Sequence, residues 1–169
     1  MKKYELTDDS ITFMGRKLFR IRAIRSFNDV AAGDLGGYVE KEENLSHDDN
    51  AWIYNDARIY DDARISDNAY ICGDAYICGN ACISGDARIS GDALIYGMTD
   101  YLCFQGLGSE NRNTTFFKCK DGHIHVSCGC FSGNLAEFET KVKKTHGDSK
   151  YAKEYLACIE VVKIHFEKE

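Results

Sequence analysis

Residues 51–98 read AWIYND ARIYDD ARISDN AYICGD AYICGN ACISGD ARISGD ALIYGM, and this stretch decides the fold. It divides into eight consecutive six-residue units without an insertion. Every unit begins with alanine and carries isoleucine at its third position, from Ile53 to Ile95. The fifth and sixth positions are mostly Gly, Asp or Asn, which tolerate the dihedral angles of turns. A period of six is not helical, so we expect short strands separated by turns.

An aliphatic residue every six positions, followed four positions later by a small residue, resembles the hexapeptide-repeat family. In that family three units form one triangular coil, the inward isoleucines stack into a core, and the alanines occupy the tight corners. The resemblance therefore implies a mainly β protein built around a left-handed parallel β-helix. Because neighbours of a buried strand residue point the opposite way, the second and fourth positions of each unit are expected to face outward.

Coils of three units stack residues 18 positions apart and sort the outward side chains into three columns, two of them aromatic and one polar. Soluble monomers rarely expose broad apolar patches, so either the flanking segments or other subunits must cover the aromatic columns. Hexapeptide-repeat proteins are often trimers, and the resemblance favours a homo-oligomer of that kind. The expected interface residues are Trp52, Tyr60, Tyr70, Tyr76, Leu94 and Tyr96.

Residues 1–50 are expected to form an N-terminal cap and an irregular first coil. In this part Phe19, Ile21 and Ala23 alternate with Arg20 and Arg22, which predicts a half-buried strand. The glycine-rich stretch 33–38 suits a sharp turn into the repeats.

Residues 99–169 are expected to form a ββαα module. Asp121-Gly122 is a strong signal for a two-residue hairpin loop, and it predicts strands over 114–120 and 123–131. That loop places Lys120 opposite His123, and Cys119 opposite Ile124.

Two helices follow the hairpin. The first is predicted to start after Asn134 as N-cap, with Glu137 completing a capping box, and to end at Gly147. The second begins near Ser149 and carries an apolar face.

The composition excludes several classes of protein. The net charge is −6 and the pI is about 5.4, which makes nucleic acid an unlikely partner because binding it requires neutralised phosphates. Neither a signal peptide nor a membrane span is recognisable in the sequence, so we expect a cytoplasmic protein. In that setting the eight cysteines are best interpreted as reduced, small hydrophobic residues.

The repeats do not show the residues of hexapeptide-repeat enzymes. The acyltransferases of this fold use a histidine base near a coil corner, and its zinc carbonic anhydrases use three coil histidines. Residues 51–98 contain no histidine and no looped-out insertion. His47 is the single candidate base beside the coils, and an ordinary surface role suits it better. We therefore expect neither a catalytic residue nor a cofactor.

A dense group of cysteines and histidines near the hairpin raises the question of a metal. Zinc uses Cys and His at short spacings, and this group comprises Cys119, His123, His125, Cys128 and Cys130. The expected hairpin register, however, puts both histidines on the face opposite Cys119 and beside Lys118 and Lys120. The sequence therefore predicts no metal site.

Basic residues lie away from the repeats, and we expect an anionic ligand or a partner to bind them, because Arg binds phosphate and carboxylate groups in a bidentate manner. At the N-terminal end the candidates are Arg20 and Arg22. The alternative is that they lie on a solvated strand face and pair with nearby acidic side chains. In the C-terminal part the alternative is an ordinary solvated loop. The candidates there are Arg112, Thr114, Thr115, Lys118, Lys120, His123 and His125.

Beyond the repeats, the whole chain resembles small proteins encoded by phages and prophages of Gram-positive gut bacteria. The shared stretches are Gly33–Tyr38, Glu43–His47, Gly129-Cys130-Phe131, Thr145-His146-Gly147 and Lys153-Glu154-Tyr155. The resemblance implies the fold and a phage origin, but no activity. By analogy with small accessory phage proteins, which often block host defence or bind host factors, we expect a non-enzymatic binding protein in the host cytoplasm. Its expected partner is a host protein or a small anionic ligand such as a signalling nucleotide, which it would sequester or inhibit as a counter-defence protein. A degenerate acyltransferase and a virion component are the alternatives.

Overall fold

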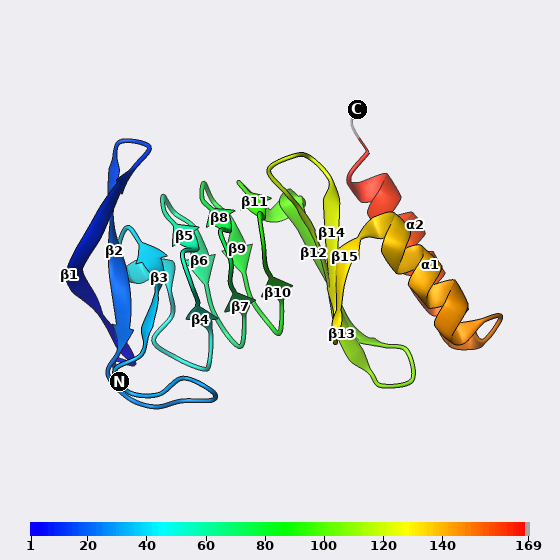
Figure 1. Cartoon of the computed structure of the whole chain (residues 1–169), viewed down its shortest axis with the longest axis horizontal. Coiled ribbons are helices and arrows are strands. Elements are labelled where there is room, and N and C mark those ends of the chain that lie inside the picture. The colour runs from blue at the N-terminus through cyan, green and yellow to red at the C-terminus, as the bar shows by residue number, and fades with distance from the viewer. Residues whose placement is uncertain (168–169) are drawn as a thin grey trace. The chain divides into compact units, whose positions relative to one another are not determined.

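The computed structural model describes residues 1–167. The chain forms two compact units, Met1–Met98 and a C-terminal unit that starts at Thr99 (Figure 1). The repeats and the residues before them belong to the same unit, here called the coil unit.

The coil unit is a parallel β-helix of about three coils, and it confirms the left-handed β-helix that the hexapeptide array predicts. Each repeat contributes one two-residue strand. Partners lie 18 residues apart, as when Tyr70 pairs with Trp52 and with Arg88, so the three predicted columns are correct. The strands are β4 (Trp52–Ile53), β5 (Arg58–Ile59), β6 (Arg64–Ile65), β7 (Tyr70–Ile71), β8 (Tyr76–Ile77), β9 (Cys82–Ile83), β10 (Arg88–Ile89) and β11 (Leu94–Ile95).

Packing inside the coils follows the repeat. The alanines and isoleucines of the eight units are at most 1% exposed. The fifth position takes a positive φ from Asn55 (56°) to Gly91 (61°), which explains why it holds only Asn, Asp or Gly. Turn side chains also bridge the coils, because Oδ2 of Asp67 accepts a hydrogen bond from the amide of Gly85 at 2.7 Å.

The N-terminal residues extend the solenoid. Strands β1 (Tyr4–Phe13), β2 (Arg16–Ala23) and β3 (Leu35–Val39) form an antiparallel ribbon, and β3 then pairs in parallel with β5. After the 3-10 turn η1 (Glu42–Asn44), Leu45 bridges to Ile65. An irregular first coil is therefore present.

This ribbon and its loop cover part of the aromatic columns. Trp52 is 2% exposed beneath the rings of Tyr4 and Phe27, whose centroids lie 6.3 and 5.4 Å away. Tyr60 is 5% exposed against Phe13. The prediction that Trp52 and Tyr60 form an oligomer interface is wrong, because the chain's own N-terminal residues bury them.

The C-terminal unit has four strands where the sequence predicted two. The antiparallel sheet β12-β13-β14-β15 comprises β12 (Tyr101–Leu107), β13 (Arg112–Lys118), β14 (Ile124–Cys128) and β15 (Phe131–Asn134). The predicted strand 123–131 is interrupted at Gly129, which takes a φ of 58° and turns the chain back into β15. The short 3-10 turn η2 (Met98–Asp100) precedes the sheet.

The predicted hairpin register is off by one residue. Lys118 pairs with Ile124 and Phe117 with His125, and the amide of Cys119 donates to the carbonyl of His123 at 3.0 Å. The loop therefore has three residues, Lys120 to Gly122, with a φ of 87° at the glycine. A one-residue slip exchanges the faces of a strand, so Cys119 shares a face with both histidines.

The two helices are confirmed. Helix α1 (Leu135–His146) has Asn134 as N-cap in a capping box with Glu137, and α2 (Lys150–His165) has Ser149 as N-cap. Their apolar faces pack on the sheet through a core that includes Phe116, Val126, Phe138 and Ile159.

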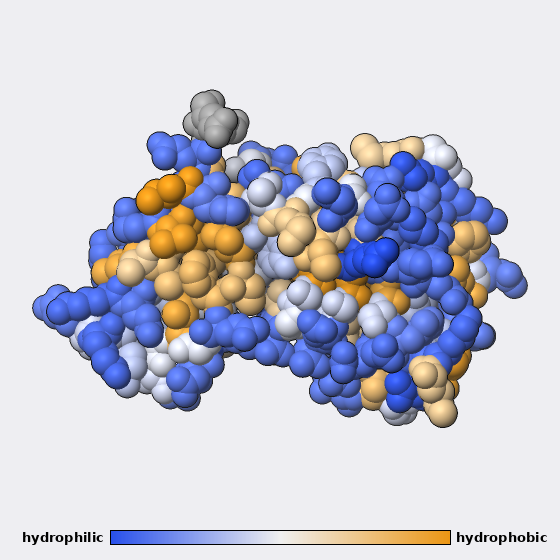
Figure 2. Space-filling model, turned by 180° about the vertical axis from the view of Figure 1, so that it is seen from behind, coloured by the Kyte–Doolittle hydropathy of each residue, from blue (hydrophilic) through white to orange (hydrophobic). Residues whose placement is uncertain are grey.

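Apolar side chains also reach the surface of the C-terminal unit. Val161 and Ile164 of α2 are exposed, and Figure 2 shows apolar side chains gathered over the helical part of this unit. Neither helix of residues 1–167 is long and apolar enough to cross a membrane.

Candidate functional site

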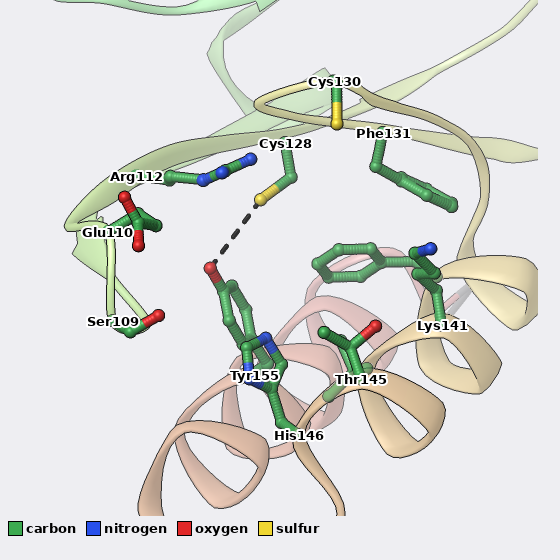
Figure 3. A pocket seen from close by; sticks show the side chains of 12 residues that line it. Ser109, Glu110, Arg112, Cys128, Cys130, Phe131, Lys141, Thr145, His146 and Tyr155 are labelled. Atoms are coloured by element: carbon green, nitrogen blue, oxygen red, sulfur yellow. Dashed lines mark hydrogen bonds between the residues drawn. The ribbon is translucent and has the colours of Figure 1, made fainter.

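A pocket in the C-terminal unit is the best candidate for a binding site. It has a volume of about 310 Å³ and lies where the ends of β13 and β14 meet α1 and α2 (Figure 3). The side chains that line it are Ser109, Glu110, Arg112, Cys128, Cys130, Phe131, Phe138, Lys141, Val142, Thr145, His146 and Tyr155.

The sheet supplies Arg112, the first residue of β13. Figure 3 shows its guanidinium reaching across the pocket toward Cys128. Gly129 makes this position possible, because a Cβ at Gly129 would collide with the guanidinium. None of the acidic groups in residues 1–167 forms an ion pair with Arg112, so its five donors are available to a ligand.

Helix α1 supplies the other basic groups. Lys141 and His146 line the pocket from successive turns, and the imidazole of His146 stacks on the ring of Tyr155 with centroids 5.6 Å apart. Within the described chain, Glu110 is the one acidic residue of the lining. The pocket is therefore more basic than the chain as a whole, which carries a net charge of −6.

The floor of the pocket is apolar and its polar atoms are satisfied. The hydroxyl of Thr114 donates to Sγ of Cys128 at 3.1 Å, the thiol faces Oη of Tyr155 at 3.8 Å, and that hydroxyl donates to the carbonyl of Leu107 at 3.2 Å. Burial and the nearby thiol raise the pKa of Tyr155. Tyr155 is thus a neutral hydrogen-bonding group near pH 7 and not a base.

The structure brings together only part of the predicted anion site. Arg112 lines the pocket, but Thr114 and Thr115 are fully buried and donate to the thiols of Cys128 and Cys103. Their prediction as ligand contacts is wrong, because the antiparallel neighbours β12 and β14 enclose them within the sheet.

The remaining C-terminal candidates lie elsewhere. Lys118 pairs with Asp100 at 2.7 Å, and Lys120 lies in the hairpin loop. His123 and His125 meet at the other end of the hairpin from Arg112, with ring centroids 5.9 Å apart.

At the N-terminal end, both candidate arginines have acidic partners. Arg20 donates to the hydroxyl of Tyr38 at 2.8 Å and approaches Asp56 at 3.4 Å. Nε of Arg22 donates to Glu5 at 2.9 Å. These contacts match the alternative of a solvated strand face whose arginines pair with acidic side chains, and they leave no group of unpaired basic residues for an anion.

Sequence reasoning missed Lys141, His146 and Tyr155, because they come from helices that are distant in sequence from Arg112. One signal was available. The stretches Gly129-Cys130-Phe131, Thr145-His146-Gly147 and Lys153-Glu154-Tyr155, on which the family resemblance was based, contribute five lining residues between them.

His47, the candidate base beside the coils, is held by packing. Its ring stacks on that of Tyr4 with centroids 4.3 Å apart, and Nδ1 accepts the amide of Lys3 at 3.3 Å. Burial lowers the pKa of His47. These contacts describe a structural residue that anchors the N-terminal ribbon.

Comparison with known proteins identifies a family of repeats within the coil unit and one relative. Residues 57–73 match the YdcK β-solenoid repeat. The uncharacterized acetyltransferase YdcK of Escherichia coli (strain K12) is 40% identical over 63 residues, which cover 32% of this chain and 19% of that protein. The chain thus spans about a fifth of that relative's length. Both matches support a β-helix repeat protein.

Proposed function

We propose that this protein is a non-enzymatic binding protein whose C-terminal pocket takes a small organic anion. The observation that carries the proposal is the pairing of Arg112 and Lys141, which lack acidic partners among residues 1–167, with a floor of Phe131, Phe138 and Val142. Basic groups at the rim suit a phosphate or carboxylate, and the apolar floor suits a flat, partly apolar body.

The chemistry of the pocket favours binding over catalysis. Its tyrosine has a raised pKa and its buried thiol is engaged with that tyrosine, so neither group is prepared to act as base or nucleophile at neutral pH. A nucleoside monophosphate matches both halves of the pocket. The resemblance to phage-encoded proteins supports a biological setting in host cytoplasm, where such a protein would sequester a signalling nucleotide or inhibit a host factor.

Isothermal titration calorimetry with adenosine 5′-monophosphate and with adenosine tests this proposal. The phosphate is expected to supply most of the binding free energy. The monophosphate should therefore bind, and adenosine should bind at least tenfold more weakly. Arg112→Ala removes charge-assisted hydrogen bonds of about 1.5–3 kcal/mol, which corresponds to a loss of affinity of about 10–150-fold.

A matched pair of helix variants provides the control. Lys141→Ala is expected to weaken binding of the monophosphate, whereas Lys143→Ala is not, because Lys143 is paired with Glu139 outside the pocket. Equal affinity of Arg112→Ala, Lys141→Ala and the unaltered chain would refute the proposed site.

The name of the relative supports a second candidate, an acetyltransferase. Release of coenzyme A from acetyl-coenzyme A in the presence of amine acceptors measures this activity. Turnover that persists in Arg112→Ala but disappears in His47→Ala would favour the enzyme over the binding protein.

Oligomerisation through the coil faces stays a proposal for the side chains that the N-terminal ribbon leaves accessible. Tyr96 is 55% exposed, and Tyr70, Tyr76 and Leu94 are partly exposed. A trimer that uses this surface would become monomeric in light scattering after Leu94→Glu with Tyr96→Glu. A monomeric unaltered chain would refute it.

A further inference from the structure

The hairpin between β13 and β14 collects three metal-ligating side chains at one point. One ligand atom each of Cys119, His123 and His125 lies within 4.8 Å of the other two. Thiolate sulfur and imidazole nitrogen are the ligands that zinc prefers, at about 2.3 Å and about 2.0–2.1 Å respectively. This cluster lies outside the pocket described above.

The observed register creates the cluster. The amide of Cys119 donates to the carbonyl of His123, and His125 pairs with Phe117 two residues along the same face. The predicted register placed two lysines, Lys118 and Lys120, beside the histidines. The shift moves Lys118 to the other face and leaves Lys120 in the loop. Lys118 pairs with Ile124 on the opposite face, and Asp100 holds its ammonium group at 2.7 Å.

Both histidines have the outer hydrogen bonds that are typical of metal ligands. Nδ1 of His123 lies 2.5 Å from Oδ1 of Asp121, and Nε2 of His125 lies 2.8 Å from Oγ of Ser132. Such contacts fix the tautomer and the orientation of a ligating imidazole, and leave the opposite nitrogen to the metal. The aspartate also accepts the amide of His123, so the loop orients the carboxylate as well.

The surroundings suit a metal that remains open to solvent on one side. Cys119 is 5% exposed, whereas His123 is exposed and His125 is half-buried against the ring of Phe117.

We propose that Cys119, His123 and His125 form a zinc site with three protein ligands and a fourth position open to water or an external ligand. Binding forms one Zn–S and two Zn–N bonds and releases the thiol proton of Cys119 to solvent. Tetrahedral zinc holds its ligand atoms about 3.5 Å apart, so a cluster whose ligand atoms lie within 4.8 Å of one another closes by at most about 1.3 Å on binding. A small shift of the exposed loop, which carries Asp121 and His123 together, can supply that movement.

Cobalt(II) titration of the metal-free, reduced full-length chain tests the proposal. We expect one Co²⁺ per chain, with the strong visible d–d absorption of a tetrahedral site and a near-ultraviolet band from thiolate coordination. Addition of Zn²⁺ should bleach both bands. Failure of the unaltered chain to develop these bands would overturn the proposal.

Variants distinguish this cluster from the other thiols and imidazoles of the C-terminal unit. Cys119→Ser should abolish the thiolate band, and His125→Gln should lower Co²⁺ affinity by at least 100-fold. Cys130→Ser and His146→Asn, in the same unit but outside the cluster, should bind like the unaltered chain. Thiolate-bound Co²⁺ that persists in Cys119→Ser would refute the assignment.

Asp121→Asn separates a metal site from a merely structural hairpin. It retains the size of the side chain but removes the charge that orients His123, so Co²⁺ affinity should fall by about 10–100-fold while the circular dichroism of the metal-free chain is unchanged. The same affinity in Asp121→Asn and the unaltered chain would contradict the proposed role of the aspartate. The metal titration does not involve Arg112, so its failure would leave the proposed anion pocket unaffected, and failure of the anion pocket would leave the metal site unaffected.

Discussion

The coil unit and the C-terminal unit use their charged side chains differently. In the coil unit Arg16 contacts Glu40 and Asp61, Arg20 contacts Asp56, and Arg22 contacts Glu5. In the C-terminal unit Arg112 and Lys141 face a pocket without an acidic partner in residues 1–167. A repeat offers each residue type the same environment many times, whereas a binding site requires unlike groups at one point. The proposed binding site accordingly lies in the irregular unit and not in the repeats.

The largest expected effect on stability comes from a substitution inside the coil unit. Ile77→Asp places a charge at a fully buried position between Ile59 and Ile95 of neighbouring coils, which should cost several kcal/mol of a total stability of about 5–15 kcal/mol. Thermal unfolding followed by circular dichroism measures it.

The control for Ile77→Asp adds the same charge where the repeat accepts it. Asn80→Asp occupies the exposed sixth position of a unit, which is already Asp in most units. It should unfold at nearly the temperature of the unaltered chain. An unchanged melting temperature in Ile77→Asp would mean that the coil register is wrong.

An intermediate effect tests how the coil unit covers its own aromatic column. The ring of Phe13 packs against Tyr60 at 5.8 Å and Tyr76 at 4.8 Å, and the guanidinium of Arg58 lies 4.8 Å from its centre. Because Phe13 is half-buried, Phe13→Ala should cost about 2 kcal/mol, below the range of fully buried phenylalanines.

The neighbouring exposed Thr12 offers a matched control, since Thr12→Ala removes no aromatic contact. Chemical denaturation compares the two variants. Equal stability would show that the ribbon does not protect this column, and would return Tyr60 to consideration as an intermolecular contact.

The smallest expected effect is a pH dependence at the junction of ribbon and coils. Burial lowers the pKa of His47 below its ordinary value of about 6.5, against the opposing influence of Glu42 and with a contribution from Lys2 and Lys3. The unfolded chain therefore takes up a proton before the folded chain does as the pH falls. Stability is fully present above about pH 6.5 and declines toward the folded pKa.

The melting temperature of the coil unit should thus fall slightly between about pH 7.5 and about pH 5.5. His47→Gln, which cannot titrate, should show a flatter profile over the same interval. Parallel profiles in the two proteins would contradict a lowered pKa of His47.

Local periodicity was sufficient to predict the coils from sequence, but contacts between distant segments were not predictable. Ile77 and its equivalents repeat every six residues, so the six-residue period followed from spacing, and the three columns followed from the resemblance to the hexapeptide-repeat family. Spacing correctly placed Trp52 on an outer face of the coils, but Tyr4 and Phe27 cover that face at Trp52, and no local pattern links these residues.

The hairpin shows how a small difference in loop length changes a chemical conclusion. Asp121-Gly122 indicated a two-residue loop, but Lys120 also belongs to the loop, and the strands shift by one residue. That shift brings Cys119 to the face of His123 and His125. The candidate pocket could not be predicted from the sequence either, since Arg112 and Lys141 line the same cavity only after the helices pack on the sheet.

Inter-coil hydrogen bonds that join residues 18 positions apart also determine how such a chain can change in length. Removing one full coil would reconnect each strand to the same sheet and shorten the solenoid by about 4.8 Å, the spacing between neighbouring strands. Removing a single hexapeptide would instead rotate every later unit onto the next face of the triangle, and the polar column of Arg64 and Cys82 would come into line beneath aromatic neighbours. Insertions and deletions compatible with the fold therefore come in steps of three units, and the solenoid lengthens in discrete increments.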